Sequence, residues 1–366
     1  MRRRILTAAG ACTALACTPQ ALRGALAADA DAAGAPVRYP AVLPGTALAF
    51  PRDFGAHPEF RTEWWYITGW LREAQREFGV QITFFRSRTG HDPRNPSRFA
   101  PTQLLLAHAA LALPEDGRLR HDQRAARAGF GFASASEADT DVAIGRWRLR
   151  REGDDRYHAV IPADGFALDL KFAPRGAPFP QGDAGYSRKG PRPEQASRYY
   201  SRPQLAVQGS VRLQAGPAST VGGVAWLDHE WSSELLDAAA TGWDWIGLNL
   251  DDGSALMAFR VRDRSGAALW SHARWAGSAR AADTVRFEPM RQWRSARSGA
   301  SYPSAMRVSV DERRFELLPL FDDQELDTRA STGTIYWEGA VRVLEAGRPV
   351  GRGYLELTGY AGALRL

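Results

Sequence analysis

Residues 63–71 read Glu-Trp-Trp-Tyr-Ile-Thr-Gly-Trp-Leu, a run rich in aromatic residues. Aromatic and β-branched residues favour β-strands, in which successive side chains point to opposite faces. By this alternation Glu63 shares a face with Trp65 and Ile67. The stretch therefore predicts a strand whose inner face buries an acid among apolar side chains.

Similar short runs recur along the chain, separated by clusters of Gly, Pro, Asp and Asn, which is typical of all-β proteins. The first series of expected strands covers 63–71, 77–86, 104–113, 146–151, 157–162, 166–173, 206–213 and 221–227. The second series covers 244–250, 254–262, 269–275, 284–293, 306–310, 315–319, 334–343 and 351–359. Each series is large enough for a barrel, so we predict two antiparallel β-barrel domains in tandem.

Two segments suggest how the domains are divided. Residues 28–49 are rich in Ala, Pro and Gly without periodicity, which predicts a flexible tether that ends near the start of the folded body. Residues 232–240 form a short, alanine-rich segment. Beyond the first 27 residues, this is the one segment that we consider a candidate helix. We expect the domain boundary there, with an N-terminal domain at 50–233 and a C-terminal domain at 234–366.

The segment from 174 to 203 is rich in Pro, Gly, Arg and Tyr. An unstructured loop of this length either covers a site or lies free in solvent, and the sequence leaves both alternatives open. In the first case, five side chains would line an entrance: Tyr186, Lys189, Arg198, Tyr199 and Tyr200.

The N-terminus has the order of a signal peptide. Three arginines at 2–4 precede an uncharged run at 5–17, and small residues follow up to Ala27. The run is shorter than the roughly twenty residues that cross a bilayer, so we expect residues 1–27 to be a cleaved leader. The paired arginines also fit a twin-arginine signal. A lipoprotein cleavage site before Cys17 is an alternative to the cut near Ala27. The predicted location is periplasmic or secreted.

Processing changes what the composition means. Cys12 and Cys17 are the two cysteines of the chain, and both lie in the leader. A mature protein cut near Ala27 therefore has no disulfide and no catalytic or metal-binding thiol. The leader also holds four arginines and no acid, so its removal lowers the formal charge from +6 to +2. A charge this small gives no reason to expect a nucleic-acid partner.

Motifs for metals, phosphates and nucleophilic serines are missing. The sequence contains no Gly-x-Ser-x-Gly, no phosphate-binding Gly-rich loop ending in Lys-Ser or Lys-Thr, and no His-Glu-x-x-His. The seven histidines, at 57, 91, 108, 121, 158, 229 and 272, have no zinc-site spacing. The sequence predicts neither a metal nor a cofactor.

Three clusters place acids between tryptophans. They read Arg-Thr-Glu-Trp-Trp-Tyr at 61–66, Trp-Leu-Asp-His-Glu-Trp at 226–231 and Gly-Trp-Asp-Trp-Ile-Gly-Leu-Asn-Leu at 242–250. Asp244 falls on the apolar face of its strand, where burial would raise its pKa and favour the protonated form that a general acid needs. The alternative for each of these acids is a structural role, in which the buried carboxylate pairs with Arg61 or a backbone N–H.

The second cluster carries a geometric restriction. In a regular strand, Asp228 and Glu230 lie on one face, whereas His229 and Trp231 lie on the other. The acid and the imidazole can therefore face one cavity only if a turn or bulge interrupts the strand at 228–231.

The combination of motifs resembles the carotenoid 1,2-hydratase (hydroxyneurosporene synthase) and AttH-like family. The matching runs are His-Pro-Glu-Phe-Arg-Thr-Glu-Trp-Trp-Tyr at 57–66, the clusters at 226–231 and 242–245, and two closing runs at 333–339 and 353–360. The resemblance covers nearly everything from residue 50 onwards. It implies two lipocalin-like barrels with an apolar cavity at or between them.

The resemblance implies one of two functions. In the first, the protein is a hydro-lyase that adds water to an isolated double bond of a polyene or other terpenoid without a cofactor. Its acid would be Asp228 or Asp244, and His229 would be the base that positions water. The aromatic faces that stabilise a carbocation would come from Trp231, Trp243 and Trp245. The remaining substrate contacts would be Glu63, Trp65, Tyr66 and Glu230.

In the second, the same cavity binds a lipid or polyene without chemistry, and the protein is the periplasmic carrier of an ABC transport system. A hydrophobic small molecule is the expected partner in both cases. Export favours the carrier, because carotenoid synthesis takes place at the cytoplasmic membrane. The complete set of acids, histidine and tryptophans favours the hydro-lyase, and the sequence leaves the choice open.

Overall fold

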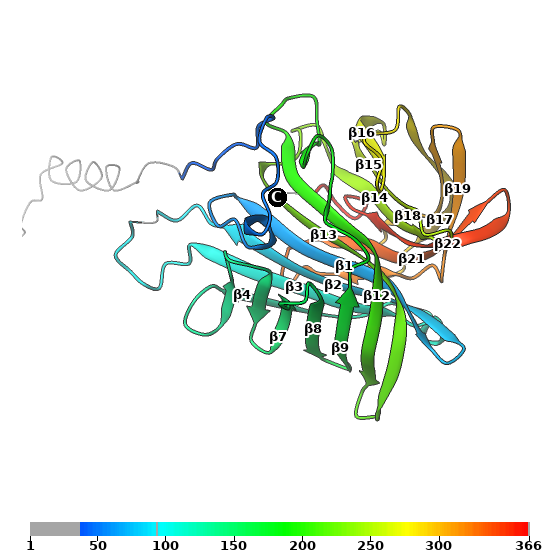
Figure 1. The fold of residues 1–366 in the computed structure, drawn as a ribbon, viewed down its shortest axis with the longest axis horizontal. Coiled ribbons are helices and arrows are strands. Elements are labelled where there is room, and N and C mark those ends of the chain that lie inside the picture. Colours follow the sequence, from blue (N-terminus) through cyan, green and yellow to red (C-terminus); the bar gives the residue numbers. More distant parts are fainter. Residues whose placement is uncertain (1–36, 93, 365–366) are drawn as a thin grey trace, which may run out of the picture.

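The computed structural model describes residues 37–92 and 94–364. The expected leader at 1–27 and the beginning of the expected tether lie outside these residues. The described chain forms two antiparallel β-sheets, which Figure 1 shows side by side, the first in blue to green and the second in yellow to red. The predicted all-β class with two barrel-like domains is confirmed.

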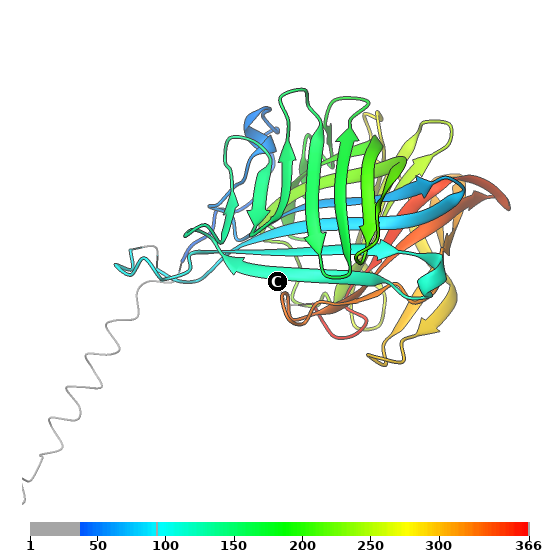
Figure 2. The same cartoon turned by 90° about the horizontal axis from the view of Figure 1, so that it is seen from below.

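The first sheet wraps into a nearly closed barrel. Its main strands follow the order β4-β3-β2-β1-β13-β12-β9-β8-β7-β6-β5, and the short β10 and β11 pair with β12. Figure 2 shows these strands curling round the cyan and green part of the molecule. Their bounds are β1 Thr62–Glu73, β2 Arg76–Arg88, β3 Gln103–Ala112, β4 Arg120–Arg127, β5 Ala133–Ala135, β6 Asp141–Ile144, β7 Trp147–Arg151, β8 Tyr157–Ala163, β9 Phe166–Ala173, β10 Phe179–Pro180, β11 Tyr186–Arg188, β12 Ala196–Leu213 and β13 Ala218–Glu234.

The second sheet forms a half-barrel and does not close as the first nearly does. Its order is β16-β15-β14-β22-β21-β19-β18-β17, with β20 on β21. The bounds are β14 Gly242–Leu250, β15 Ala255–Arg262, β16 Ala268–Trp275, β17 Val285–Arg294, β18 Ser301–Val310, β19 Arg313–Pro319, β20 Glu325–Asp327, β21 Ile335–Glu345 and β22 Arg348–Leu357. Two 3₁₀ turns, Arg52–Phe54 and Pro114–Asp116, are the helical pieces of the described chain.

Strand alternation separates three apolar clusters. One face of β1 buries Trp65 and Ile67 in the core of the first barrel. The strands β14 and β22 bury Ile246 and Leu355 in the core of the second. The opposite faces of these strands meet between the barrels, where Trp70 belongs to a third cluster.

Several local expectations are wrong. Residues 232–240 form no helix, because β13 continues to Glu234 and a turn follows. The segment 174–203 is not an unstructured loop, since it contains β10, β11 and the start of β12. Part of the expected tether is also packed: Val42 lies against Tyr186, and the Arg198 guanidinium donates to the carbonyl oxygen of Leu43 at 2.8 Å.

The two barrels approach closely. The Trp70 indole on β1 donates to the carbonyl oxygen of Gly353 on β22 at 3.0 Å. A Cβ on Gly79 of β2 would lie 2.5 Å from the hydroxyl oxygen of Tyr354, so glycine is needed there for the barrels to meet. Among the residues described, no helix has the length and apolar character of a membrane-crossing segment.

Candidate functional site

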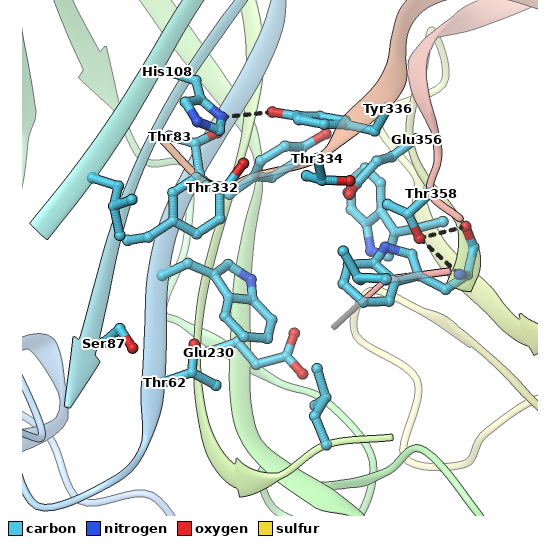
Figure 3. Close-up of a pocket in the computed structure, with 18 of the residues that line it drawn as sticks. Thr62, Thr83, Ser87, His108, Glu230, Thr332, Thr334, Tyr336, Glu356 and Thr358 are labelled. Carbon is cyan, nitrogen blue, oxygen red and sulfur yellow. Dashed lines mark hydrogen bonds between the residues drawn. The ribbon is translucent and has the colours of Figure 1, made fainter. Parts of the chain in front are cut away.

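A cavity of about 350 Å³ lies between the two barrels. The outer faces of β1, β2, β3 and β13 form one wall, and those of β14, β15, β21 and β22 form the other. Aromatic side chains cover much of both walls, among them Trp64, Tyr66, Phe85, Trp243, Trp245 and Phe259. Figure 3 shows Glu230 on one side of this space and His108, Tyr336 and Glu356 along another.

Asp228 lies on the cavity wall and is almost completely buried. Its Oδ2 accepts a hydrogen bond from the Tyr199 hydroxyl at 2.7 Å. Its Oδ1 accepts from the Ser201 hydroxyl at 2.5 Å and the Trp226 indole at 2.7 Å. Burial raises the pKa of Asp228 to about 7, although the three hydrogen bonds oppose the shift. Both protonation states are therefore populated near neutral pH.

Glu230, two residues along the same face, also lines the cavity. The Lys189 ammonium lies 3.0 Å from its Oε1, so the wall contains one buried ion pair. Burial lowers the pKa of Lys189, and the charges of Glu230 and Asp228 oppose that shift. The same ammonium lies 4.2 Å from the ring centroid of Phe259, a cation–π contact that joins the barrels.

His108 and Tyr336 close another part of the cavity, and their side chains come from different barrels. Tyr336 Oη lies 2.9 Å from His108 Nδ1, the contact drawn as a dashed line in Figure 3. The Ser331 hydroxyl lies 2.9 Å from Nε2. Burial lowers the pKa of His108 to about 3, so its imidazole is neutral at physiological pH.

His229 does not face this cavity. Strand β13 pairs with β1 in unbroken register from Arg72↔Gly222 to Thr62↔Ser232, so the bulge that would bring His229 beside Asp228 is absent. The His229 ring lies in the first barrel, where Nε2 is 2.9 Å from Glu63 Oε1 and Nδ1 is 3.1 Å from the Tyr200 hydroxyl. A role for His229 in positioning water at Asp228 does not fit this geometry.

Glu63 is the centre of a buried network inside the first barrel. Its Oε1 lies 2.9 Å from His57 Nδ1, and its Oε2 accepts from Arg86 Nε at 2.8 Å. The second ring nitrogen of His57 lies 3.2 Å from Asp53 Oδ1. Although burial opposes the shift, these hydrogen bonds with two carboxylates raise the pKa of His57, which favours its protonated form. Burial would raise the pKa of Glu63, but its hydrogen bonds with His229 and His57 lower it.

The network also brings together three residues of the kinds that bind metals, two histidines and one glutamate. The donor atoms of His57, Glu63 and His229 lie within 4.8 Å of one another, which the scattered spacing of these residues in the sequence did not indicate. Each of these atoms already has a hydrogen-bond partner, and Arg86 neutralises the carboxylate. The arrangement is complete as a hydrogen-bonded ion network, and it needs no metal to satisfy its polar atoms.

Asp244 lies in the core of the second barrel. Arg260 Nε donates to its Oδ2 at 2.6 Å, Arg262 Nε donates to its Oδ1 at 2.9 Å, and the Tyr360 hydroxyl donates to Oδ1 at 3.0 Å. The expected role of Asp244 as a general acid does not fit this geometry, because two guanidinium groups and a hydroxyl already occupy its oxygens and it is not among the residues that line the cavity. Asp244 therefore fits the alternative of a structural acid, with Arg260 and Arg262 as its partners where the sequence suggested Arg61.

The remaining predicted residues divide between the same environments. Trp65 and Trp231 belong to the core of the first barrel, stacked on His229 at 4.8 Å and on His57 at 3.6 Å between ring centroids. Tyr66, Trp243 and Trp245 line the cavity. Of the ten predicted site residues, the structure brings five to the cavity: Tyr66, Asp228, Glu230, Trp243 and Trp245.

Sequence reasoning missed two acids on the cavity wall, Glu338 on β21 and Glu356 on β22. Both belong to the closing runs of the sequence, where alternation puts Glu356 on the same face as Tyr354 and Thr358. This alternation can be seen in the sequence. It does not show whether the face that carries Glu356 meets the core of its own barrel or the other barrel.

Comparisons with known proteins agree with the architecture. A candidate AttH from Nitrosomonas europaea is 51% identical, with 88% of this chain and 99% of that chain covered and a TM-score of 0.82. Kievitone hydratase from Nectria haematococca shares the fold at 16% identity and a TM-score of 0.66, covering 89% of this chain and 98% of that one. CghA, solved with Sch210972, follows at 13% identity and 0.51, with coverages of 89% and 98%. None of the curated proteins matches this chain.

The AttH-like family matches residues 41–360, which is most of the chain and both barrels. This range contains every residue that lines the cavity except Leu364. The chain belongs to the AttH-like family.

Proposed function

We propose that the protein binds a mostly apolar small molecule, such as a polyene, terpenoid or lipid, in the cavity between the barrels. The observation that carries the proposal is an aromatic cavity with a buried acid, Asp228, whose pKa is about 7. Ligand pockets typically measure about 300–1,000 Å³ and combine apolar walls with a few polar groups. At about 350 Å³, this one suits a small ligand or one end of a longer chain.

The cavity also suits a cofactor-independent hydro-lyase resembling carotenoid 1,2-hydratase. Protonated Asp228 would give its proton to one carbon of an isolated double bond, and the faces of Trp243 and Trp245 would stabilise the cation at the other. Water would add to that carbon and lose a proton to the Glu230 carboxylate. The fold shared with kievitone hydratase is consistent with this chemistry, although at 16% identity it supports the fold alone.

A periplasmic carrier for an ABC transport system is the alternative. It is favoured by the three hydrogen bonds that already hold Asp228 and by the absence of His229 from the cavity wall. In this case the acids orient the polar end of a ligand that leaves unchanged. Both versions of the proposal include export of the protein to the cell envelope. The basic and apolar order of residues 1–27, which resembles a signal peptide, supports this part.

The test begins with mass spectrometry of apolar extracts from protein purified out of the native periplasm. The protein is then incubated with an acyclic polyene in water enriched in heavy oxygen. A labelled hydroxyl that is lost in Asp228→Asn supports the hydro-lyase, and an unchanged bound molecule supports the carrier.

A cavity-filling variant tests the site itself. Leu106 lines the cavity, so Leu106→Trp should abolish ligand retention, whereas Leu318→Trp on the exposed surface of the second barrel should not. The proposed function would be contradicted if both variants retained the ligand equally. It would also be contradicted if no preparation contained an apolar ligand and the protein did not take up the polyene.

A further inference from the structure

The wall that the second barrel contributes carries two acids side by side. Glu338 on β21 is the register partner of Glu356 on β22, and both line the cavity. Directly opposed residues of an antiparallel pair have Cβ atoms about 4.5–5.5 Å apart on one face of the sheet. Two carboxyl groups therefore share a small area of a wall that also carries aromatic side chains and the hydroxyl groups of Thr334 and Thr358.

Glu338 has one oxygen in use and one without a partner. Its Oε1 accepts a hydrogen bond from the Tyr66 hydroxyl, which reaches across from the first barrel. Its Oε2 is buried and has no hydrogen-bond partner among the described residues. Leaving a buried polar atom unpaired costs free energy, so an unpaired atom at a cavity wall indicates where a ligand group binds.

No cation neutralises this pair within the part of the chain that the structure describes, since neither glutamate has an ion-pair partner there. Burial raises the pKa of Glu338 well above its ordinary value, and the neighbouring Glu356 charge adds to the shift. Burial also raises the pKa of Glu356 to about 8, against a hydrogen bond with the Trp243 indole. Both groups therefore carry a proton at neutral pH and can donate it to a hydrogen bond.

We propose that the Glu338 and Glu356 carboxyl groups bind a hydroxyl or carbonyl oxygen of the otherwise apolar ligand, with Glu338 Oε2 as the donor. The inference rests on the proposed function, because it needs a ligand in this cavity. It narrows the ligand class to apolar molecules with an oxygen function, such as terpenoid alcohols. A pure hydrocarbon would leave Oε2 unpaired, and so would bind less tightly.

Three probes of one carbon skeleton test the inference: farnesene, farnesol and farnesylamine, titrated against the full folded chain at pH 7 by tryptophan fluorescence. The wild type should bind farnesol about tenfold more tightly than farnesene, which is the effect of one hydrogen bond. Glu338→Met removes the donor and should bring the two affinities together without weakening farnesene. Glu338→Gln keeps an N–H donor and should retain most of the preference.

The control is Glu316→Met, which removes a glutamate paired with Arg307 outside the cavity and should keep the wild-type preference. Thermal unfolding of each variant shows whether it is folded. Equal affinity of the wild type for farnesol and farnesene overturns the inference but not the proposed function. Tightest binding of farnesylamine, lost in Glu338→Gln, also overturns it, because the pair would then act as an ionised cation site. No binding of any probe contradicts the proposed function instead.

Discussion

At the residue scale, burial favours the neutral form of each polar group in this protein, and hydrogen-bond and charge partners decide whether a buried group ionises all the same. His108 is buried between hydroxyl groups and stays neutral, while Glu63 is buried among cations and stays ionised. Asp228 falls between these cases. It accepts three hydrogen bonds, and it forms no ion pair with any residue that the structure describes. The protonation state of Asp228 can therefore change near neutral pH.

The neutral imidazole of His108 should make the protein sensitive to acid. Its pKa is about 3 in the folded protein, against about 6.5 when unfolded. As pH falls from 6.5 towards 3, the unfolded chain takes up a proton that the folded one does not, so stability is lost. His108→Gln should reduce this loss by an amount on the order of a few kcal/mol.

Urea unfolding at pH 7, 5.5 and 4.5 measures the effect. The exposed His91 provides the matched control, since His91→Gln also removes one histidine. If the two variants lose stability equally on acidification, the buried His108 is not the source.

The Glu63 network should be costly to break. Arg86 is buried and donates to Glu63, Gln103 and the carbonyl oxygens of His57 and Phe60. Arg86→Met removes the guanidinium that pairs with this buried carboxylate, and breaking a buried pair typically costs about 3–5 kcal/mol. Arg94→Met, which breaks an exposed pair with Asp92, should change the free energy of unfolding very little. Similar urea midpoints for the two variants would show that the buried pair is not needed.

Strand alternation predicted part of this residue chemistry. It placed Asp228 and His229 on opposite faces, and the regular β13 confirms that placement. It did not predict that Arg260 and Arg262 neutralise Asp244, because that pairing depends on the register between β14 and β15. Alternation identifies which residues share a face, but not which neighbour the face meets.

At the element scale, the most regular strands were the predictable ones. Strand β9, Phe166–Ala173, alternates between buried residues and half-buried or exposed ones, and was predicted with the same bounds. Strand β4, Arg120–Arg127, was missed because its sequence has no apolar alternation and it lies at one end of the sheet order. The long β12 and β13 were predicted only in part, since their polar ends become strand by pairing with each other.

Strand β2 illustrates how one position fixes the distance between barrels. A Cβ at Gly79 would lie 2.5 Å from the Tyr354 hydroxyl oxygen and 2.7 Å from the Cβ of Ala340. Gly79→Ala should therefore push the barrels apart and destabilise the protein by about 1–3 kcal/mol, as overpacking does. Gly90→Ala, where no atom lies within 4 Å of the added Cβ, is the matched control. Thermal unfolding compares them, and an unchanged midpoint for Gly79→Ala would mean that the interface gives way easily.

At the scale of the whole molecule, the outer faces of the two barrels form a second core. The third apolar cluster takes residues from both sheets, including Tyr66 and Trp70 from the first and Trp245 and Tyr354 from the second. The cavity is the part of this interface that side chains do not fill. The family resemblance implied an apolar cavity at or between the barrels, but the sequence did not predict which strand faces form this interface. Both faces of such strands are apolar, so the pattern does not say which face meets the other barrel.

Polar contacts tie the same interface together. Gln204 of the first barrel donates from its backbone N–H to Asn249 Oδ1 of the second at 2.8 Å, and from Nε2 to the carbonyl oxygen of Leu250 at 2.9 Å. Arg352 of the second barrel pairs with Glu77 of the first at 2.6 Å. An interface that is both apolar and hydrogen-bonded favours two domains that move and unfold as one body.

We therefore expect a single unfolding transition for both barrels. The open second sheet would expose its share of the third cluster if the first barrel unfolded alone, and the first would expose Trp70 and Tyr66 in return. Tryptophan fluorescence and far-ultraviolet circular dichroism should give coincident urea curves. Trp70→Phe, which removes the hydrogen bond to Gly353, should lower the common midpoint without splitting the curves. Two separate transitions in the wild type would show that each barrel is stable alone, and that the cavity between them can open without unfolding either one.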